Sequence, residues 1–201
     1  MRYPADQKQK TRQRILEAAA VVFRREGLQA GSVDKVMGEA GLTAGGFYAH
    51  FASKDALFAE MLVESLRQSR LASAAEKDEA LSGPARIRAL ADYYLTPAHR
   101  HSIDRGCLMP PLLADLPRAG EPARRAFEEV LGEITATLAP HLRDESDQPS
   151  TDRALALLSV LIGGMTLARA VADDTVADRI LAACRRLIEA ALIEPAQPSN
   201  A

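Results

Sequence analysis

An all-α protein is what the sequence predicts, on the strength of three observations. The chain is 47% hydrophobic but only 4% aromatic and has no Trp. This composition suits packed helices better than a β-sandwich. Apolar residues recur at helical spacing along most of the chain, and helix-starting and helix-stopping residues separate these segments. We therefore expect about nine helices within the 201 residues.

The N-terminal quarter contains four predicted helices with clear end signals. The first runs over about residues 11–26 and ends at Gly27. Ser32 can cap a second helix over residues 33–40, and Gly41 supplies the left-handed turn that ends it. Thr43 caps a short third helix over about residues 43–50, and Ser53 caps a long fourth helix that begins at residue 54 and fades over residues 73–79.

The third predicted helix is too short and glycine-rich to serve as a core helix. Phe47 and Phe51 are four residues apart and share one face, while Ala44, Tyr48 and His50 point elsewhere. Two short helices joined by a turn containing Gly form a helix-turn-helix unit, whose second helix enters the DNA major groove. The spacing therefore predicts a helix that is presented to DNA.

This N-terminal segment resembles the DNA-binding domain of the TetR/AcrR transcriptional regulators. The resemblance covers residues 11–57, roughly the first quarter of the chain, while the remainder matches only in length and helical pattern. The matching residues are Thr11-Arg12, Ile15-Leu16, Ala18-Ala19, Phe23, Gly27, Ser32-Val33, Ala40-Gly41-Leu42-Thr43, Gly45, Phe47-Tyr48, His50-Phe51, Ser53-Lys54-Asp55 and Leu57. The resemblance implies a helix-turn-helix DNA-binding domain over residues 8–68 and a larger helical ligand-binding and dimerisation domain over residues 69–195.

Five further helices are predicted in the second domain. Gly83-Pro84 opens one that continues to residue 95, with Pro97 as its stop and an irregular histidine-bearing link after it. A short helix begins near Pro110, and another covers about residues 122–142. Ser150 or Thr151 caps an apolar helix containing residues 154–168; after a break at residues 173–175, the final helix covers residues 176–193. Residues 196–201 are expected to form a disordered tail.

Charge is distributed unevenly along the chain. Residues 1–55 hold nine Lys or Arg against six Asp or Glu, whereas the chain as a whole has a net charge of -2. A basic N-terminal part with an acidic remainder is consistent with phosphate attraction at one end of the molecule.

Several residues are candidates for contact with double-stranded operator DNA. Tyr48 and His50 can bond phosphate oxygens, and Lys54 adds a charge at a helix N-terminus. The resemblance implies the full set Ser32, Lys35, Thr43, Ala44, Gly46, Tyr48, His50 and Lys54. Many relatives carry longer polar side chains where this chain has Ala44 and Gly46. We therefore expect few hydrogen bonds to bases, so that thymine-methyl contact and DNA shape contribute more to sequence discrimination. The cations Lys35, Lys8, Lys10 and Arg12 are expected to compensate for the missing base contacts.

The last two helices predict a dimer. Gly163-Gly164 interrupts an apolar helix at a cost of about 1 kcal/mol for each glycine, which close helix approach could offset. The alternative is that this helix lies at the centre of its own domain. The resemblance favours a homodimer, because TetR-like proteins pack their last two helices into a four-helix bundle, and two-fold symmetry then requires a near-palindromic operator. The expected mechanism is a repressor that a small-molecule or reactive inducer releases from DNA.

The inducer pocket is less clearly marked in the sequence. Candidate lining residues are Tyr93, Tyr94, Cys107, Met109, Phe127, Met165 and Arg169. Cys107 also resembles a cysteine through which some TetR-like proteins are thought to respond, so it is a candidate redox sensor. His99, His101 and Cys107 could alternatively bind a divalent metal, or Cys107 could be a small buried hydrophobe and the histidines plain loop residues. Of these, the last interpretation is favoured, and no metal or cofactor is expected.

Other classes of protein leave no signature in the chain. The spacing from Gly41 to Gly46 opens like a P-loop, but Phe47-Tyr48 stands where Lys-Ser/Thr is needed, so no enzyme is expected. Residues 1–8 lack the apolar segment of a secretory signal, and the two cysteines are too far apart in sequence to suggest a disulfide framework. The apolar run of residues 154–168 is shorter than a membrane span. We expect a cytoplasmic protein with no membrane contact. The alternative function is a helical protein-interaction or regulatory module that does not bind DNA.

Overall fold

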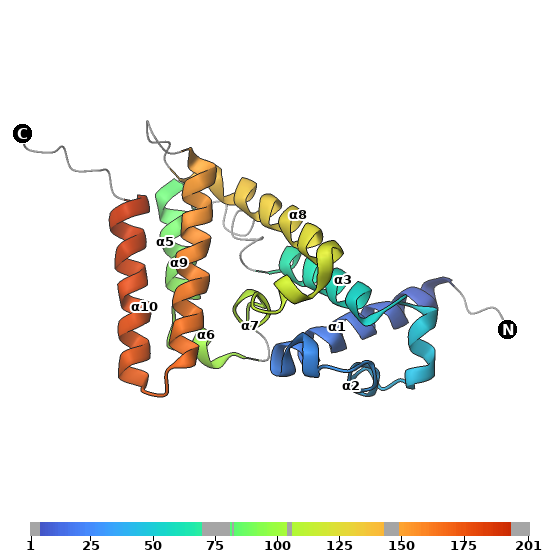
Figure 1. Ribbon diagram of the computed structural model, residues 1–201. Helices are drawn as coiled ribbons and strands as arrows, with labels where there is room; N and C mark the ends of the chain where they lie inside the picture. The colour runs from blue at the N-terminus through green and yellow to red at the C-terminus, as the bar shows by residue number, and fades with distance from the viewer. Residues whose placement is uncertain (1–4, 70–80, 82, 104–105, 143–148, 194–201) are drawn as a thin grey trace, which may run out of the picture. The chain divides into compact units, whose positions relative to one another are not determined.

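Most of the described part of the chain is helical. The computed structural model describes residues 5–69, 81, 83–103, 106–142 and 149–193, and none of these residues is in a strand. The elements, shown in Figure 1, are α1 (Ala5–Ala30), α2 (Val33–Glu39), η1 (Ala44–Ala49), α3 (Lys54–Arg67), α5 (Gly83–Tyr94), α6 (Pro97–His101), α7 (Met109–Leu112), η2 (Leu116–Arg118), α8 (Gly120–Leu138), η3 (Ala139–His141), α9 (Ser150–Ala170), α10 (Asp174–Ile188) and η4 (Glu189–Ile193). The predicted all-α class is confirmed.

Two compact units make up the chain. The first comprises Met1–Gln68 and Ile103–Val130, and the second comprises Ser69–Ser102 and Leu131–Ala201. The predicted functional division into residues 8–68 and 69–195 stays a prediction. The predicted tail at residues 196–201 and the predicted fading of the fourth helix over residues 73–79 lie outside the described residues.

The core of the first unit forms where α1 packs against α3. Phe23 of α1 meets Phe58 of α3 edge to face, with ring centroids 5.6 Å apart and an interplanar angle of 75°. Ile15 and Ala19 of α1 and Leu57 of α3 are fully buried beside this pair. Helical spacing places these apolar residues on the facing sides of the two helices, and their burial fixes α1 on α3.

The predicted helix ends in this unit are largely confirmed. The Ser32 hydroxyl accepts the Lys35 N–H at 3.2 Å, and the Ser53 hydroxyl accepts the Ala56 N–H at 3.0 Å. Gly41 has φ 67°, the left-handed conformation expected at the end of α2. Thr43 occupies the cap position of the next element, but its side chain makes no capping hydrogen bond, so the predicted Thr43 cap is wrong.

Two other elements of this unit differ from prediction. α1 begins at Ala5, and its helical geometry resumes after Gly27, which has φ 75°. The N–H of Leu28, freed by this kink, donates to the Asp115 carboxylate at 2.7 Å. The predicted third helix is a 3₁₀ helix of six residues, a form that is common in short pieces because its hydrogen-bond geometry is poorer.

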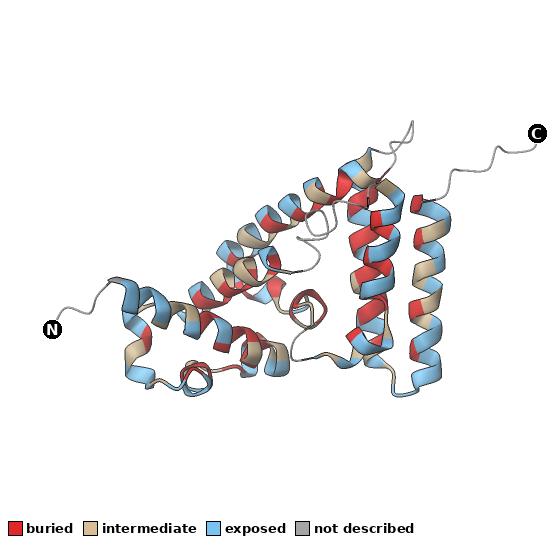
Figure 2. Cartoon of the chain, turned by 180° about the vertical axis from the view of Figure 1, so that it is seen from behind, coloured by how far each residue is buried: buried red, intermediate tan, exposed pale blue. Residues whose placement is uncertain are grey.

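In the second unit, α5, α9 and α10 lie side by side (Figure 1). Figure 2 shows buried residues concentrated along one side of each of these helices. The fully or almost fully buried residues include Ile87, Leu90, Leu157, Leu161, Met165, Leu181 and Ile188. Gly164 is also buried, and its backbone lies against Cys184 of α10. The close helix approach predicted from Gly163-Gly164 therefore occurs within the chain at Gly164.

A buried arginine holds η4, the π-helical turn that follows α10. Arg153 of α9 is only 2% exposed, and its guanidinium donates to the carbonyl oxygens of Ala191 and Leu192 at 3.2 and 3.1 Å. Carbonyls at the end of a helix carry partial negative charge and lack intrahelical partners. The Arg153 guanidinium supplies donors to these carbonyls near the end of η4.

Four element boundaries in the C-terminal part differ from prediction. Thr96 caps α6 through the His99 N–H, so Pro97 starts a short helix where it was predicted only to stop one. The 3₁₀ turn η2 was not predicted. Pro149 occupies the cap position of α9 without a side-chain bond, so the predicted Ser150 or Thr151 cap is wrong. Asp173 caps α10, which begins two residues before the predicted start.

Helix α9 is longer than its apolar run. It spans 21 residues, has a mean hydropathy of 1.4 over its most apolar stretch and is the one helix among the described residues long and apolar enough to cross a bilayer. Within the chain, 44% of that stretch is buried. The core helix of a soluble protein also passes such a test, so length and composition are weak evidence for a membrane span.

The contact between α9 and α10 can be tested at Gly164. A Cβ at this position would lie 2.5 Å from the Cys184 Sγ and 3.3 Å from its Cβ, so Gly164→Ala requires the helices or the thiol to move. We expect the free energy of unfolding to fall by about 1 to 3 kcal/mol in urea denaturation. Gly132→Ala, with nothing within 4 Å of the added Cβ, is the control and should gain up to about 1 kcal/mol. Unchanged stability of Gly164→Ala would contradict the tight packing, whereas partial recovery by Cys184→Ala would support it.

Candidate nucleic-acid interface

The 3₁₀ helix η1 follows α2 after the turn at Gly41. The N–H of Leu42 closes this turn on the Met37 carbonyl at 2.8 Å. The Arg14 guanidinium of α1 donates to the carbonyl of Ala40, the capping residue of α2, at 2.7 Å. Local turn chemistry and a long-range arginine contact together fix the point from which η1 starts.

Buried phenylalanines attach η1 to the core of the first unit. Phe47 and Phe51 are 0% and 3% exposed, and their rings stack with centroids 5.8 Å apart. The predicted burial of this pair is confirmed. Its burial leaves the rest of η1 on the surface.

The surface of η1 is nearly smooth apart from one side chain. Thr43, Ala44, Gly45 and Ala49 are exposed, and Gly46 is half-buried. Tyr48 projects from this surface with 74% of its area exposed, while its ring forms a T-shaped contact with the Phe47 ring at a centroid distance of 5.2 Å. A tyrosine offers an aromatic face and a hydroxyl, and both suit contact with a nucleic-acid backbone.

His50 ends η1 and is partly covered. Its Nδ1 atom is buried and finds no hydrogen-bond partner among the described residues. Desolvation by burial lowers the pKa of His50, and the charges of Lys8 and Arg12 lower this pKa further. The imidazole is therefore neutral near neutral pH, which allows it to donate one hydrogen bond and accept another.

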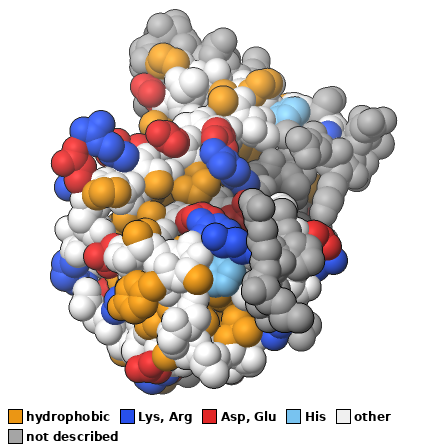
Figure 3. All heavy atoms as spheres, turned by 90° about the vertical axis from the view of Figure 1, so that its right-hand side faces the viewer, with side chains coloured by type: hydrophobic (Ala, Val, Ile, Leu, Met, Phe, Trp, Pro, Cys, Tyr) orange, Lys and Arg blue, Asp and Glu red, His pale blue; other side chains and the backbone are white. Residues whose placement is uncertain are grey.

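The cations near this surface differ in their internal partners. Lys35 pairs with Glu26 at 2.5 Å, and Lys54 donates to the Leu28 carbonyl at 2.8 Å. Lys10 pairs with Asp6 at 2.8 Å, and Arg12 is bound to Glu60. Figure 3 accordingly shows Lys and Arg side chains beside Asp and Glu side chains on the face it presents.

The predicted inducer-binding residues fall into two groups. Cys107, Met109 and Phe127 belong to the first unit; Met109 is fully buried, and the other two are half-buried. Tyr93, Tyr94, Met165 and Arg169 belong to the second unit. Within that unit Tyr94 and Met165 are core residues, whereas Tyr93 is 45% exposed.

Arg169 takes part in a reciprocal arginine arrangement within the second unit. Its guanidinium donates to the carbonyl oxygens of Arg100 and His99 at 3.2 and 3.0 Å. The Arg100 guanidinium donates in return to the carbonyl oxygens of Ala168 and Val171 at 2.7 and 2.9 Å. The two side chains thus tie α6 to the end of α9, a structural role for Arg169 that its position in the sequence did not reveal.

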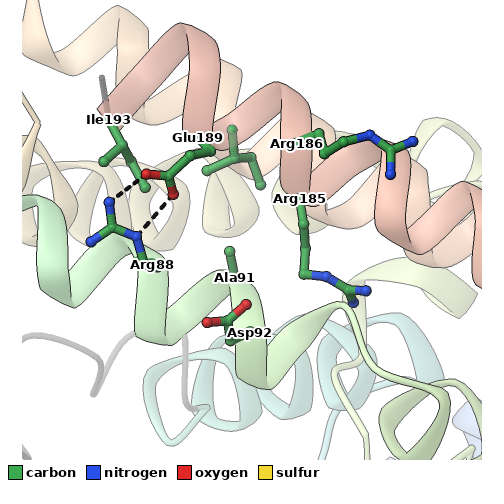
Figure 4. Close-up of a pocket in the computed structure, with 8 residues that line it drawn as sticks. Arg88, Ala91, Asp92, Arg185, Arg186, Glu189 and Ile193 are labelled. Carbon is green, nitrogen blue, oxygen red and sulfur yellow. Dashed lines mark hydrogen bonds and ion pairs between the residues drawn. The ribbon is translucent and has the colours of Figure 1, made fainter. Parts of the chain in front are cut away.

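A cavity of about 240 Å³ lies in the second unit and is lined by residues of α5, α10 and η4. Figure 4 shows Arg88 and Glu189 joined across it, with Asp92 and Arg186 also labelled along its wall. The Arg88–Glu189 pair lowers the pKa of the Glu189 carboxyl, first through the hydrogen bonds from Arg88. None of the predicted inducer-binding residues lines this cavity. Those residues were predicted mainly because they are aromatic or Met, whereas the cavity is lined mostly by charged side chains.

The histidines and cysteines have other surroundings than the metal hypothesis requires. The Nδ1–H groups of His99 and His101 donate to the carbonyl oxygens of Tyr94 and Pro97, both at 2.8 Å. No group of three His, Cys, Asp or Glu side chains suited to a metal is found in the described ranges. Neither Cys107 nor Cys184 forms a disulfide, and burial raises the pKa of the Cys184 thiol.

A helix-turn-helix unit with a buried phenylalanine pair and one protruding tyrosine defines a helical DNA-binding protein. Comparison with known families agrees with this class. Residues 15–61 match the bacterial regulatory proteins of the tetR family, and residues 83–184 match the tetracyclin repressor-like C-terminal domain. The chain belongs to the TetR family and is a DNA-binding transcriptional regulator. The family resemblance predicted from residues 11–57 is confirmed.

Two curated relatives match parts of the chain. An uncharacterised HTH-type transcriptional regulator of Bacillus subtilis, YdgC, is 39% identical over 54 residues, which are 27% of this chain and 28% of that protein. The transposon Tn10 TetC protein of Escherichia coli is 25% identical over 136 residues, covering 67% of this chain and 66% of TetC. The chain thus spans about a quarter of the length of YdgC and just under two thirds of TetC.

Solved structures share the fold across most of the chain. The reduced form of NemR from E. coli has a TM-score of 0.77 at 20% identity, covering 94% of this chain and 100% of NemR. A TetR transcriptional regulator from Chloroflexus aurantiacus has a TM-score of 0.72 at 23% identity, covering 93% and 98% of the two chains. A protein from Saccharomonospora viridis in complex with choline has a TM-score of 0.72 at 18% identity, covering 93% and 100%. At such identities the likeness establishes the fold alone.

The environment of His50 predicts its titration. Because burial, Lys8 and Arg12 lower the pKa of His50, NMR titration of the free protein should place it below the ordinary value of about 6.5. A folded-state pKa below the unfolded value means that the neutral form is favoured, so the contribution to stability is present above about pH 6.5 and lost as pH falls. Lys8→Gln should raise the pKa of His50, and His50→Gln should remove part of the acid destabilisation. A His50 pKa at or above the ordinary value would contradict this description of its surroundings.

Proposed function

We propose that this regulator is a homodimeric repressor that binds a near-palindromic operator through η1 and is released by a small-molecule inducer. The observation that carries the proposal is Tyr48, a large side chain 74% exposed on an element whose neighbouring phenylalanines are buried. An exposed aromatic on a loop-like element, with rigid attachment beneath it, suits binding far better than stability. The cytoplasm, where the chromosome lies, is the proposed location.

In the proposed complex, η1 lies in the major groove with its small residues against the bases. Ala44 and Gly46 carry no hydrogen-bonding side chain, so thymine-methyl contact and DNA shape contribute most of the discrimination. The small side chains let the backbone of η1 come close to the base edges.

The phosphate contacts flank η1. Tyr48 and His50 bond phosphate oxygens from the end of η1, while Ser32, Thr43 and the first N–H groups of α3 contact the backbone from helix N-termini. Lys35 and Lys54 exchange their present partners, Glu26 and the Leu28 carbonyl, for phosphate. Contacts of this type position the protein on the duplex and make its affinity depend on salt.

The proposed dimer interface is the outer half of α9. From Leu155 to Ala170, every exposed residue of this helix is uncharged. Leu155 and Leu167 are 41% and 59% exposed, and Gly163, between them, has nothing within 4 Å of an added Cβ. A helix that is apolar on nearly every face normally has all of its faces covered, which favours a second copy packed against this half.

Helix α10 adds to the same proposal. Val176 and Leu187, 39% and 53% exposed, lie on one face of α10, and half-buried Ile180 lies between them. Two helices from each of two copies then form a four-helix bundle, as the family resemblance implies. Isologous pairing places two copies of η1 on one operator, which is why a near-palindromic sequence is expected.

The proposed inducer binds the C-terminal domain. The tetracyclin repressor-like match over residues 83–184 supports a ligand-binding role, as does the choline complex of a protein with a similar fold. Tyr93, Tyr94, Cys107, Met109, Phe127, Met165 and Arg169 remain the predicted lining residues, and Cys107 remains a candidate redox sensor. Release from DNA requires different inducer affinities in the bound and free states, typically a coupling of about 1 to 3 kcal/mol.

The DNA contact is tested by replacing Tyr48. A duplex enriched from a random-sequence pool by the wild-type protein serves as the probe, and binding is measured by fluorescence anisotropy. Tyr48→Ala should weaken binding by roughly tenfold or more through the loss of a phosphate bond and a packed ring. Tyr48→Phe should lose less, because it retains the ring.

The control is Ile103→Ala, which removes the other large apolar side chain exposed in the described part of the first unit. It should bind as the wild type does. Failure of the wild-type protein to enrich any duplex would leave the protein-interaction module as the better description of η1. A reporter gene placed under the enriched duplex gives the sign of regulation, and increased expression in the presence of the protein would contradict repression.

The dimer is tested by placing a charge on the exposed half of α9. Leu167→Arg should convert the protein to monomers in light-scattering chromatography, because burial of an unpaired charge costs several kcal/mol. Ala136→Arg, at an exposed position of α8 in the same unit, should leave the molecular mass unchanged. A wild-type protein that is monomeric at micromolar concentration would refute the proposed interface.

A further inference from the structure

The guanidinium of Arg12 joins three elements of the first unit. Its Nε donates to Glu60 Oε1 of α3 at 3.0 Å, and its Nη2 donates to Glu60 Oε2. Its Nη1 donates to the carbonyl oxygen of His50, the residue that ends η1. The guanidinium carbon lies 4.1 Å from the centroid of the Phe51 ring. We name this arrangement of Arg12, Glu60, the His50 carbonyl and the Phe51 ring the Arg12 clamp.

Helix η1 needs an attachment of this kind. It has six residues, two of them glycine, and Thr43, which occupies the cap position before it, makes no side-chain capping bond. A short 3₁₀ helix has poor hydrogen-bond geometry, and glycine adds backbone entropy that folding must overcome. The position of η1 therefore depends on its contacts with the rest of the unit.

The Arg12 clamp supplies those contacts where the hydrogen bonds of η1 end. The paired donors of a guanidinium match both oxygens of one carboxylate, and a cation over an aromatic face is attracted by the ring. Phe51 stacks on Phe47, which in turn makes a T-shaped contact with the Tyr48 ring. Packed rings thus connect the guanidinium of α1 to the exposed tyrosine.

We propose that Arg12 is the positioning residue of the DNA-reading surface: with Glu60 it holds η1, and therefore Tyr48, at the orientation that DNA requires. Arg12 acts through the Phe51 ring and the His50 carbonyl, and its charge is offset by Glu60 in place of a phosphate. The inference rests on the proposed contact of η1 with DNA. It differs from the sequence prediction, in which Arg12 is one of the cations that compensate for sparse hydrogen bonding to bases.

The two roles predict opposite effects of neutralising Glu60. If Arg12 contacts phosphate, Glu60→Gln removes a competing anion and tightens DNA binding. If Arg12 positions η1, Glu60→Gln loosens the clamp and weakens binding. Arg12→Lys separates the roles further, because it keeps the positive charge but loses the planar fork that binds a carboxylate at two points.

The experiment measures affinity for the enriched duplex, by anisotropy, over a range of salt concentrations. For a positioning role, Arg12→Gln, Arg12→Lys and Glu60→Gln should each weaken binding by roughly tenfold, while the slope of log K against log salt stays at the wild-type value. The Arg12→Gln, Glu60→Gln double variant should lose little more than either single variant. Lys8→Gln is the matched comparison, because it removes an exposed cation of α1. Loss of one phosphate contact would lower the magnitude of the slope of log K against log salt by about 0.9.

A second measurement does not depend on DNA. Hydrogen exchange in the free protein reports on the N–H groups of His50 and Phe51, both bonded to the Phe47 carbonyl at 2.9 and 3.1 Å. The Arg12 and Glu60 variants should exchange faster here, with exchange in α2 unchanged as an internal reference for folding. If the wild type enriches no duplex, the DNA contact fails, and this measurement still decides whether the clamp holds η1.

Three results would overturn the proposal. The first is tighter or unchanged DNA binding by Glu60→Gln. The second is a lower salt slope in Arg12→Gln with full affinity retained in Arg12→Lys. The third is unchanged exchange at residues 47–51 in all the Arg12 and Glu60 variants.

Discussion

Burial of the Phe47–Phe51 pair is the constraint on which the DNA-binding surface depends. The six residues of η1 have little intrinsic tendency to be helical, since two are glycine and Thr43 provides no side-chain capping bond. The stacked rings fix η1 from below, at 0% and 3% exposure, and so leave the opposite side free to remain small and smooth. A surface can lack stabilising contacts of its own when the stability comes from the residues underneath it.

Arginines provide much of the long-range order in both units. Arg12 and Arg14 of α1 reach the ends of η1 and α2, and in the second unit Arg100 and Arg169 bridge α6 and α9. In each case the acceptors include backbone carbonyls at or near a helix end, where partial negative charge accumulates and intrahelical donors are lacking. Planar guanidinium groups thus align short elements that hydrophobic contact alone would hold only loosely.

The features that the sequence predicted correctly are set by neighbours in sequence, whereas contacts between distant residues were not predicted. The Ser32 and Ser53 caps, the turn at Gly41 and the buried phenylalanines follow from local chemistry. Thr96-Pro97 is also a local pattern typical of a helix start, a capping residue followed by proline. Pro97 was predicted only to end the preceding helix. By contrast, Arg12 and Glu60 are 48 residues apart, and Arg169 and His99 are 70 apart. Periodicity also could not separate core residues such as Met165 from residues that line the cavity beside α5 and α10.

The contacts of Asp115 and Gly106 determine which residues a chimera needs in order to carry this helix-turn-helix domain. Asp115 accepts the Leu28 N–H at the kink of α1, and the Gly106 carbonyl accepts Arg24 at 3.2 Å, although both acceptors come long after the helix-turn-helix in the chain. A fragment ending at residue 68 would leave the Leu28 N–H without its acceptor. A chimera that joins this helix-turn-helix domain to the C-terminal domain of another family member would have to carry residues 103–130 as well, because the first compact unit includes them.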